Sequence, residues 1–497
     1  MGTISYGPGF HARRQAGARR ERHSESREVP ALSSATETSH THDHEVKSQP
    51  PNASHFTTRD RPTWDLYSQC VHCGLCVNQC PTYRVLGLEA DSPRGRIFQV
   101  VQVDTGRLEI NDSFVTHMDR CLGCRACETA CPSGVEYGRI LERARTEIQA
   151  NYQRPFLTRV ARDYTYKTVL RRFRSLRRWA RLLRFYQNSG MQRAVRASGV
   201  LKLMGMEQVE ALTPRMDDKF FLDEIGRFYP AQGERRGRVA FLAGCIASVA
   251  FSELNRATIR VLNANGIEVH VPEHQRCCGA LHCHAGYRKE ARHLARINIR
   301  ALLDETFDAI VTNAAGCGAT LKEYDELLEH DDKHSERAKV FASKVRDVTE
   351  YLAEVGLRPP AKPAKLRVTY QDPCHLAHGQ KVRKQPRELI KAVGVELLEM
   401  SRPDQCCGSA GVYNVVENEL SMQILNQKMD DVVATGAETI VTANVGCMLQ
   451  LRAGAQQRQL GSEVLHVVEL LDRVYQAEKR SAEEGNRGKR HSRDRKN

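Results

Sequence analysis

Two cysteine runs near the start of the chain repeat one spacing. The first run, CVHCGLCVNQCP, has the pattern C-x2-C-x2-C-x3-C-P, and the second, CLGCRACETACP, repeats it 51 residues later. Their cysteines are Cys70, Cys73, Cys76 and Cys80, then Cys121, Cys124, Cys127 and Cys131. In this pattern a C-x2-C-x2-C loop supplies three of the four thiolates of a [4Fe-4S] cluster, and the fourth comes from elsewhere. The spacing therefore predicts two [4Fe-4S] clusters.

The fourth thiolate of each cluster is expected from the opposite run, because in two-cluster ferredoxins the cysteine before proline ligates the other cluster. One cluster would use Cys70, Cys73, Cys76 and Cys131, and the other Cys121, Cys124, Cys127 and Cys80. Gly74 and Gly123 suit the tight turns of the two loops. Structural zinc is the alternative, although zinc sites use two pairs of ligands rather than two runs of four.

The second half of the chain contains an internal repeat. Three landmarks recur 129, 129 and 130 residues apart: GRVAFLAGC and KLRVTYQDPC, RCCGA and QCCGS, DAIVTNAAGC and ETIVTANVGC. Each copy alternates short β-branched runs with segments of helical period, which predicts parallel sheets with right-handed crossovers. The expected fold is therefore α+β and α/β: a helical ferredoxin-like module with two clusters, followed by two tandem α/β lobes with CCG motifs.

The repeat also places cysteines where each lobe could bind a ligand. Cysteines that follow strands or begin helices converge at the carboxyl edge of a parallel sheet, and a helix N-terminus favours the thiolate. Each lobe could hold a further iron-sulfur cluster or a zinc ion, or the thiols could simply be buried core residues. His282, His284, His375 and His378 are neighbours whose roles stay open. The candidate cysteines are Cys245, Cys277, Cys278 and Cys317, then Cys374, Cys406, Cys407 and Cys447.

Composition changes along the chain predict six segments. The basic first segment contains His40, His42 and His44, which we interpret as part of a solvated tail rather than a metal site. The expected segments are a disordered extension (1–58), the two-cluster domain (59–148), a basic helical linker (149–235), lobe 1 (236–358), lobe 2 (359–476) and a disordered charged tail (477–497).

The linker combines positive charge with an apolar stripe. Residues 154–196 contain thirteen Lys and Arg but one acid, Asp163, and the whole chain has a net charge of +14. Such a helix suits an anionic membrane surface or a docking partner, or it could pack on the core with a solvated basic face. No nucleic-acid motif accompanies it, so nucleic acid is not expected. The apolar residues of the stripe are Leu170, Phe173, Leu176, Trp179, Leu183 and Tyr186.

Overall composition limits the location and the chemistry. Hydrophobic residues make up 41% and charged residues 27% of the chain, and mean hydropathy is −0.51. The longest uncharged apolar stretch, Val239 to Phe251, is shorter than the ~20 residues that span a bilayer, and no secretory signal is apparent. We expect a cytoplasmic protein, peripheral at most on the inner face of the membrane. No dinucleotide or nucleoside triphosphate motif is found, which favours a partner that carries the organic cofactor.

Seven motifs resemble the iron-sulfur subunit of bacterial glycolate oxidase (glycolate dehydrogenase). They are CGLCVNQCPTYR, DSPRGRI, DRCLGCRACETACPSGVEYGR, CCGALHCHAG, NAAGCGATLKEY, DPCHLAHGQ with the following PREL, and CCGSAGVYN, spread over residues 65–455. The resemblance implies that an FAD subunit oxidises glycolate to glyoxylate and that this chain passes single electrons towards a membrane quinone. It also implies that the eight ferredoxin-type cysteines are ligands. Related CCG domains close each site with C-x2-C, whereas Cys317 and Cys447 stand alone, so a noncubane cluster is not expected.

The leading expectation is thus an electron-transfer subunit of an oxidoreductase acting on a 2-hydroxy acid, with no catalytic residue of its own. Alternatives are the iron-sulfur subunit of a D-lactate or glycerol-3-phosphate dehydrogenase, or of a heterodisulfide-reductase-like complex. A more distant alternative is a non-enzymatic zinc protein that binds a partner.

Overall fold

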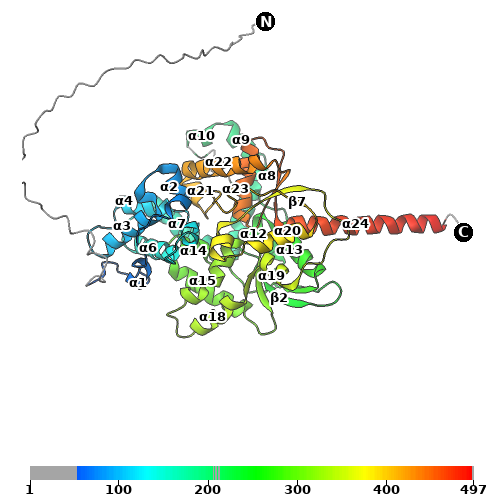
Figure 1. The fold of residues 1–497 in the computed structure, drawn as a ribbon, viewed down its shortest axis with the longest axis horizontal. Helices are drawn as coiled ribbons and strands as arrows, with labels where there is room; N and C mark the ends of the chain where they lie inside the picture. Colours follow the sequence, from blue (N-terminus) through cyan, green and yellow to red (C-terminus); the bar gives the residue numbers. More distant parts are fainter. Residues whose placement is uncertain (1–52, 205, 207–209, 211–212, 495–497) are drawn as a thin grey trace, which may run out of the picture. The chain divides into compact units, whose positions relative to one another are not determined.

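A computed structural model describes residues 53–204, 206, 210 and 213–494, all within one compact unit, Pro50–Asn497 (Figure 1). The histidines at 40, 42 and 44, and nearly all of the expected N-terminal extension, lie outside the described residues. The extension ends earlier than expected. Phe56 is buried in the core of the two-cluster domain, and the amides of Thr57 and Thr58 donate to Glu147, each at 2.9 Å.

The two-cluster domain is built from short helices and turns. Loops that wrap around clusters leave little room for long elements, and several helices begin at a proline that follows a loop, such as those at Pro81 and Pro93. Two apolar helices, α3 and α6, pack together and form its core through Ile97, Val100 and Ile140. The elements are α1 (Trp64–Tyr67), η2 (Val77–Gln79), α2 (Pro81–Leu86), η3 (Glu89–Asp91), α3 (Pro93–Asp104), α4 (Asp112–Asp119), α5 (Ala126–Thr129) and α6 (Tyr137–Asn151).

The basic linker is helical, as its periodicity predicts. Of the expected apolar stripe, Leu170 and Leu176 are buried, and Phe173 and Leu183 pack against the core of lobe 1. Trp179 is instead exposed, so the stripe is only partly covered. The elements are α7 (Phe156–Tyr164), the π-helical turn η4 (Thr165–Val169), α8 (Phe173–Asn188), α9 (Met191–Ala197), α10 (Val200–Leu203) and η5 (Phe221–Asp223).

Lobe 1 is a five-stranded sheet in the order β1-β3-β2-β4-β5. Strands β2 to β5 are parallel, with Val239 opposite Val269 on one side and opposite Ala309 on the other. The antiparallel edge strand β1 comes from the segment expected to be linker, because Phe228 pairs with His270. The elements are β1 (Phe228–Tyr229), β2 (Gly237–Phe241), α12 (Ala247–Ala250), α13 (Ser252–Ala264), β3 (Ile267–His270), α14 (Ala280–His284), α15 (Arg288–Leu302), β4 (Ala309–Thr312), α16 (Ala315–Lys322), α17 (Tyr324–Leu327), α18 (Ser335–Lys344), β5 (Val345–Asp347) and α19 (Val348–Val355).

Lobe 2 repeats this topology without the extra edge strand. Its four strands are all parallel, in the order β7-β6-β8-β9, so β6 corresponds to β2 and β8 to β4. The duplication inferred from the sequence is thus a duplication of the sheet. The elements are β6 (Arg367–Gln371), the π-helical turn η6 (His375–Gly379), α20 (Lys384–Ala392), β7 (Glu396–Leu397), α21 (Tyr413–Val416), α22 (Asn418–Thr435), β8 (Thr439–Thr442), α23 (Val445–Gln457), β9 (Glu463–His466) and α24 (Val467–Asp494).

The last helix, α24, joins the two lobes and corrects one expectation. Its apolar first turns belong to the same core as both sheets, and Asp472 binds Arg260 of α13 at 3.0 Å. The helix then continues through the segment expected to be a disordered tail (Figure 1). That segment is rich in Ala, Glu, Lys and Arg, which are good helix formers, and charge alone did not reveal this. In the described part of the chain, no helix combines the length and the apolarity needed to cross a membrane.

Candidate iron-sulfur centres

The two cysteine loops of the first domain share an unusual backbone. In each loop, the two residues that flank the middle one of the first three cysteines have positive φ: His72 (54°) and Gly74 (84°) in one, Gly123 (64°) and Arg125 (62°) in the other. A side chain in this left-handed region costs about 1 kcal/mol or more. Glycine relieves that cost at one position of each loop only. Two left-handed turns in succession bend the chain tightly, which is how three sulfurs can face one point.

The structure brings together the cysteines that the crossed pattern predicts. Burial, then negative charge at the neighbouring Cys70, raises the pKa of Cys76 to about 11, and charge at Cys131 from the other run adds to this. Burial raises the pKa of Cys127 well above its usual value, and the charges of Cys124, Cys121 and Cys80 contribute. Cys80 therefore lies with the three cysteines of the opposite loop, and Cys131 lies close to Cys76.

The second set of sulfurs lines one small cavity. Cys80, Cys121, Cys124 and Cys127 face it, and all four are buried. The Gly123 amide donates to Cys121 Sγ at 3.4 Å, and the Tyr137 hydroxyl donates to the same sulfur at 3.6 Å. Buried thiolates need donors and balancing positive charge, and this cavity offers both. The residues thus fit a [4Fe-4S] cluster, while the first set is more open, since Cys73 is exposed.

A buried arginine supplies the positive charge beside this cavity. Arg96 lines it, is 1% exposed and binds Asp91 at 3.0 Å. Negative charge at Cys121, Tyr137 and Cys80 holds the pKa of Arg96 above its ordinary value, although burial, the largest effect, lowers it. Arg96 belongs to the DSPRGRI motif, which sequence analysis quoted without assigning a role. A buried guanidinium cannot be distinguished from a surface one by sequence alone.

In lobe 1 the four candidate cysteines form a row of contacting thiols. The Cys245 thiol is hydrogen-bonded to the Cys277 thiol, and Cys277 is hydrogen-bonded to Cys278. Cys278 Sγ in turn lies 3.1 Å from Cys317 Sγ. The bond to Cys277 and burial raise the pKa of Cys245. For Cys277 and Cys278, the bond from the preceding thiol lowers the pKa, but the bond to the next thiol and burial outweigh it. These three groups are therefore neutral thiols at physiological pH.

Lobe 2 repeats the row with a different charge. Hydrogen bonds between thiols join Cys374 to Cys406, Cys406 to Cys407, and Cys407 to Cys447. Hydrogen bonds from Cys406 and Cys447 hold the pKa of Cys407 well below its usual value, and the ammonium of Lys428 lowers it further. Lys428 is fully buried on α22 and donates to the carbonyl oxygens of Arg402 and Pro403. Lobe 2 therefore holds a buried thiolate with a buried cation, which sequence analysis missed.

The CCG glycines explain why each row can form. Gly279 and Gly408 both have a φ of 90°, which only glycine adopts at little cost. A side chain at Gly408 would place its Cβ 2.5 Å from the carbonyl oxygen of Ser421. Cys317 and Cys447 are each the third residue of the helix that follows β4 or β8, as expected from the strand-to-helix pattern.

The second cluster cavity lies directly against lobe 2. Burial raises the pKa of Cys124 strongly, and the next largest contribution is the charge of Cys374, ahead of Cys121 from its own loop. Leu122, Cys124, Cys406 and Tyr413 belong to one apolar cluster, with Cys374 packed against it. The sulfurs of the first domain and of lobe 2 thus form a continuous series.

The four neighbouring histidines all make hydrogen bonds. His282 Nε2 lies 2.8 Å from the carbonyl oxygen of Tyr166, and His284 Nδ1 lies 2.8 Å from Glu142. His375 Nε2 lies 3.0 Å from the carbonyl oxygen of Gly123, and His378 Nδ1 lies 2.8 Å from Thr129. Burial lowers the pKa of His282 to about 4 and that of His375 to about 3. His282 and His375 therefore connect domains as neutral rings.

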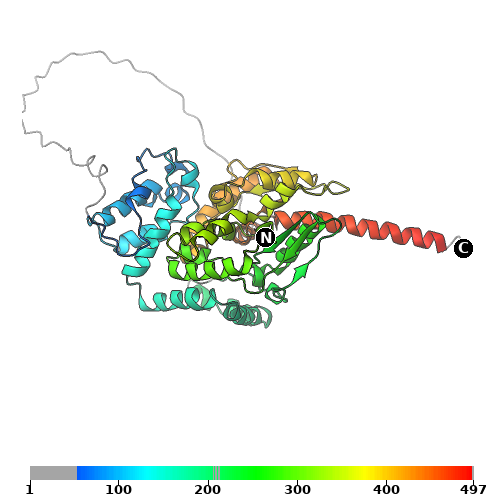
Figure 2. The same cartoon turned by 90° about the horizontal axis from the view of Figure 1, so that it is seen from below.

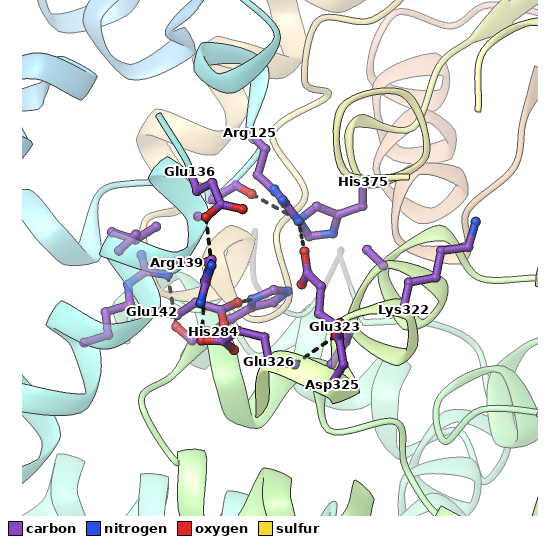
Figure 3. A pocket seen from close by; sticks show the side chains of 16 residues that line it. Arg125, Glu136, Arg139, Glu142, His284, Lys322, Glu323, Asp325, Glu326 and His375 are labelled. Carbon is purple, nitrogen blue, oxygen red and sulfur yellow. Dashed lines mark hydrogen bonds and ion pairs between the residues drawn. The ribbon is translucent and has the colours of Figure 1, made fainter. Parts of the chain in front are cut away.

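A charged cavity of about 240 Å³ lies where the first domain meets both lobes (Figure 3). Arg125 reaches Glu323 across it, and His284 reaches Glu142. Burial raises the pKa of Glu323 to about 7, whereas ion pairs with Arg288 and Arg143 outweigh burial and lower the pKa of Glu326 to about 2. Most of the ions lining this cavity are already paired, so it serves as a junction.

Among the described residues, no three or more His, Cys, Asp or Glu side chains are arranged to hold a single metal ion. The rows of contacting thiols in the lobes are consistent with that finding, because a row is not a shell around one point. The four cysteines of each lobe do lie together, as the sequence predicts. That they bind a metal or a cluster stays a prediction.

Comparisons with known proteins agree with this organisation. Residues 67–135 match the 4Fe-4S dicluster domain, residues 239–322 and 368–452 match the cysteine-rich domain called CCG, and residues 157–213 match the linker region of the glycolate oxidase iron-sulfur subunit. The chain thus combines a helical cluster-binding module, a linker and two cysteine-rich α/β domains. This combination defines an iron-sulfur protein of the dicluster and CCG class.

Relatives narrow the class to one family. The chain is 41% identical over 410 residues to the probable glycolate oxidase iron-sulfur subunit of Bacillus subtilis, covering 81% of this chain and 92% of that protein. It is 33% identical to the glycolate oxidase iron-sulfur subunit of Escherichia coli, covering 82% and 94%. Lactate utilization protein A of a Geobacillus species is 30% identical over 47% of this chain and 99% of its own length. The chain belongs to the glycolate oxidase iron-sulfur subunit family.

Proposed function

We propose that this chain transfers electrons in a flavin-dependent glycolate oxidase, which converts glycolate to glyoxylate. In this proposal an FAD subunit oxidises the substrate, and the chain carries the electrons towards a quinone-type acceptor. The chain would work in the cytoplasm, at the inner face of the membrane that holds the acceptor. It would contain no catalytic residue for the substrate chemistry itself.

The observation that carries the proposal is the continuous series of cysteine sets. Cys73 in the first set is exposed, the second set is buried, and Cys124 of that set packs against Cys374 of lobe 2. An exposed first cysteine set would let a partner deliver electrons to the chain. A buried second set would shield the following redox centre from water. A zinc-stabilised scaffold would have no use for such a series.

We assign the ligands as the crossed pattern requires. Cys70, Cys73, Cys76 and Cys131 would hold the first [4Fe-4S] cluster, and Cys80, Cys121, Cys124 and Cys127 the second. When bound, the clusters supply one-electron carriers between a two-electron flavin and its acceptor. The chain's own residues exclude water from the second site, donate hydrogen bonds to Cys121 and place Arg96 near the thiolates. The eight lobe cysteines could hold further iron-sulfur or zinc.

The flavoprotein partner would meet the chain at the first set. Val71 and Leu75 flank Cys73, and both side chains are exposed. Small apolar patches around a redox centre suit weak, rapidly exchanging partners or the edge of a larger interface. This arrangement would leave the lobe 2 end of the series for the electron's exit.

A second substrate is favoured by one comparison. Lactate utilization protein A aligns over nearly its whole length with part of this chain, so a D-lactate-type 2-hydroxy acid is the alternative. Glycerol-3-phosphate dehydrogenase and heterodisulfide-reductase-like complexes would use the same series of cysteines. Substrate preference would reside on the flavin subunit, so activity of the complex with each acid separates these cases.

The test is the replacement Cys124→Ser in the assembled complex. Iron per chain should fall by about half of its ferredoxin-type content, and acceptor reduction should be lost while the partner retains its FAD. Cys283→Ser is the matched control, since Cys283 is buried but belongs to none of the four sets. Acceptor reduction that survives Cys124→Ser would overturn the proposal, as would stoichiometric zinc in colourless wild-type protein.

A further inference from the structure

The linker helix α7 presents an apolar face to solvent. Phe156, Leu157, Val160 and Tyr164 are all exposed, with Leu157 79% exposed, and no residue of α7 is buried. Their spacing of one, three and four residues places them on one side of the helix. An amphipathic helix in a folded protein normally turns this face to the core. Here the core-facing contacts come from polar groups, such as Arg162, which donates to the carbonyl oxygen of Ala285 at 3.1 Å.

The outward face of α8 carries arginines without partners. Arg174, Arg178 and Arg181 are exposed, lie three and four residues apart, and make no hydrogen bond or ion pair within the described chain. Leu182 and Phe185 lie on the same outward side and are 59% and 62% exposed. The opposite side packs through Leu176 and Ala180. Thus α8 is covered on one side only.

The two outward faces join into one surface. The Trp179 indole donates to the Tyr164 hydroxyl at 3.1 Å, and the two rings meet edge to face with centroids 6.1 Å apart. The helices lie along the lower edge of the described chain in Figure 2. We name this the linker face: Phe156, Leu157, Val160, Tyr164, Arg174, Arg178, Trp179, Arg181, Leu182 and Phe185.

We infer that the linker face docks on an anionic lipid bilayer, with α7 and α8 lying in the plane of the headgroups. Exposed aliphatic and aromatic side chains, a Trp-Tyr pair and free arginines are the combination that an interfacial helix uses. The arginines would meet lipid phosphates while the apolar side chains enter the acyl boundary. The inference is independent of electron transfer.

Vesicle binding tests this inference with the full chain and its clusters assembled. The chain should float with vesicles of phosphatidylcholine containing phosphatidylglycerol and not with vesicles of phosphatidylcholine alone. Added salt should release it, because screening shortens electrostatic reach to about 10 Å at 0.1 M. No binding to either vesicle, or equal binding to both, would overturn the assignment to anionic lipid.

Two variants separate the contributions to binding. Arg174→Gln, Arg178→Gln and Arg181→Gln together should lower partitioning onto anionic vesicles about a hundredfold, roughly fivefold for each charge. Leu182→Ser with Phe185→Ser should abolish binding even at low salt. All five residues are exposed, so folding and iron content should not change.

The matched control is Val340→Ser with Val433→Ser, two exposed apolar residues outside the linker. This control should bind vesicles like the wild type. If the linker variants bound vesicles normally but lost the flavoprotein partner, the linker face would be a protein interface and the inference wrong. Vesicle binding needs no substrate, so its failure would leave the proposed electron transfer untouched.

Discussion

The two lobes share a topology and a cysteine pattern, yet their cysteine rows have different surroundings. Six of the seven buried positions of α15 recur in α22 at an offset of 130, and at one of these pairs Asn298 of lobe 1 stands where lobe 2 has Lys428. Asn298 donates to the carbonyl oxygen of Cys277 and to the Tyr324 hydroxyl, each at 3.0 Å. Lys428 donates to two carbonyl oxygens and brings a positive charge.

This exchange of one buried residue accompanies a difference in thiol state. Neutral thiols prevail in lobe 1, while Cys407 of lobe 2 is held as a thiolate. Lobe 2 is also the lobe whose cysteines pack against the second cluster cavity. The duplicated scaffold thus has a buried cation beside its cysteine row in lobe 2 and a neutral amide at the equivalent position in lobe 1.

The lobes also hold the first domain by different forces. Lobe 1 binds it through ions, such as Arg143 with Glu326 at 2.8 Å and Arg292 with Asp60 at 2.7 Å. Lobe 2 binds it through an apolar cluster and neutral hydrogen bonds, such as the Tyr413 hydroxyl to the carbonyl oxygen of Arg120 at 3.0 Å. Ionic contacts hold position at the junction, while the apolar contact keeps water from the sulfurs.

The largest difference between the two lobes is expected when equivalent cysteines of their two rows are replaced. Cys407→Ser should lower acceptor reduction by the complex more than about 100-fold, because even the loss of a ligand's supporting partner costs 10–100-fold in such sites. Cys278→Ser, the equivalent change in lobe 1, should retain most of the activity. Steady-state acceptor reduction and iron content measure both. Equal losses in the two variants would contradict the division of roles.

Removing the buried cation sharpens the comparison through stability. Lys428→Met removes a buried ammonium and its hydrogen bonds to the carbonyl oxygens of Arg402 and Pro403. These oxygens keep the backbone amides of Gln405 and Asp372 as donors, so the free energy of unfolding should fall by about 2 kcal/mol. The pKa of Cys407 should rise as well, since the ammonium no longer favours the thiolate. Denaturant unfolding and thiolate absorbance report the two effects. Met429→Leu on the same helix is the control and should cost less than about 1.5 kcal/mol.

Acid should weaken the lobe 1 junction through Glu326. Its pKa falls from 4.5 unfolded to about 2 folded, and its side chain is 16% exposed. The stabilisation is therefore complete above pH 4.5 and lost as pH falls towards 2, about 3 kcal/mol in all. Glu326→Gln should lower stability at neutral pH and flatten its acid dependence in denaturant titrations at several pH values.

The control for Glu326 is Glu336→Gln, which removes an exposed ion pair with Lys339 and should cost less than about 1 kcal/mol. An acid dependence that persisted unchanged in Glu326→Gln would show that other carboxylates hold the junction.

Glu323 should give the smallest effect, with the opposite sign. Its folded pKa of about 7 exceeds the unfolded 4.5, so stability declines as pH rises from 4.5 to 7. Water in the cavity moderates this decline, because the side chain is 39% exposed. Glu323→Gln should remove this one contribution, so the change in stability between pH 4.5 and 7 should be more favourable in the variant than in the wild type, measured by thermal unfolding. A steeper decline in the variant would mean that Arg125 depends on the carboxylate.

Local patterns in the sequence predicted much of this molecule. The strands around Val239, Ile310, Val368 and Ile440 were expected from β-branched runs, and the repeat predicted two equivalent sheets. The crossed grouping of the ferredoxin-type cysteines was expected because the spacing of a cluster loop allows few arrangements. Both predictions rest on short-range geometry that the chain repeats.

Features set by long-range packing could not be predicted. The sequence does not show that Asn298 and Lys428 are buried at equivalent positions of the two lobes. Arg96 likewise resembles any surface arginine in the sequence. The exposed apolar face of α7 was also missed, since amphipathic periodicity indicates a helix without showing which side is covered. The strands β1, β5 and β9 were not predicted, although β9 is as long as the predicted strands β4 and β8.

The helix α24 has a consequence for how the protein is made. Its residue Tyr475 receives a hydrogen bond from Asn265 of lobe 1 at 3.3 Å, so the sheet translated first is completed by the segment translated last. At roughly 5–20 residues per second, ribosomal synthesis separates these two partners by a time on the order of tens of seconds. During that time helix α13 of the nascent first lobe lacks the apolar cover that α24 provides. The core of lobe 1 is therefore complete only after the C-terminal helix has been translated.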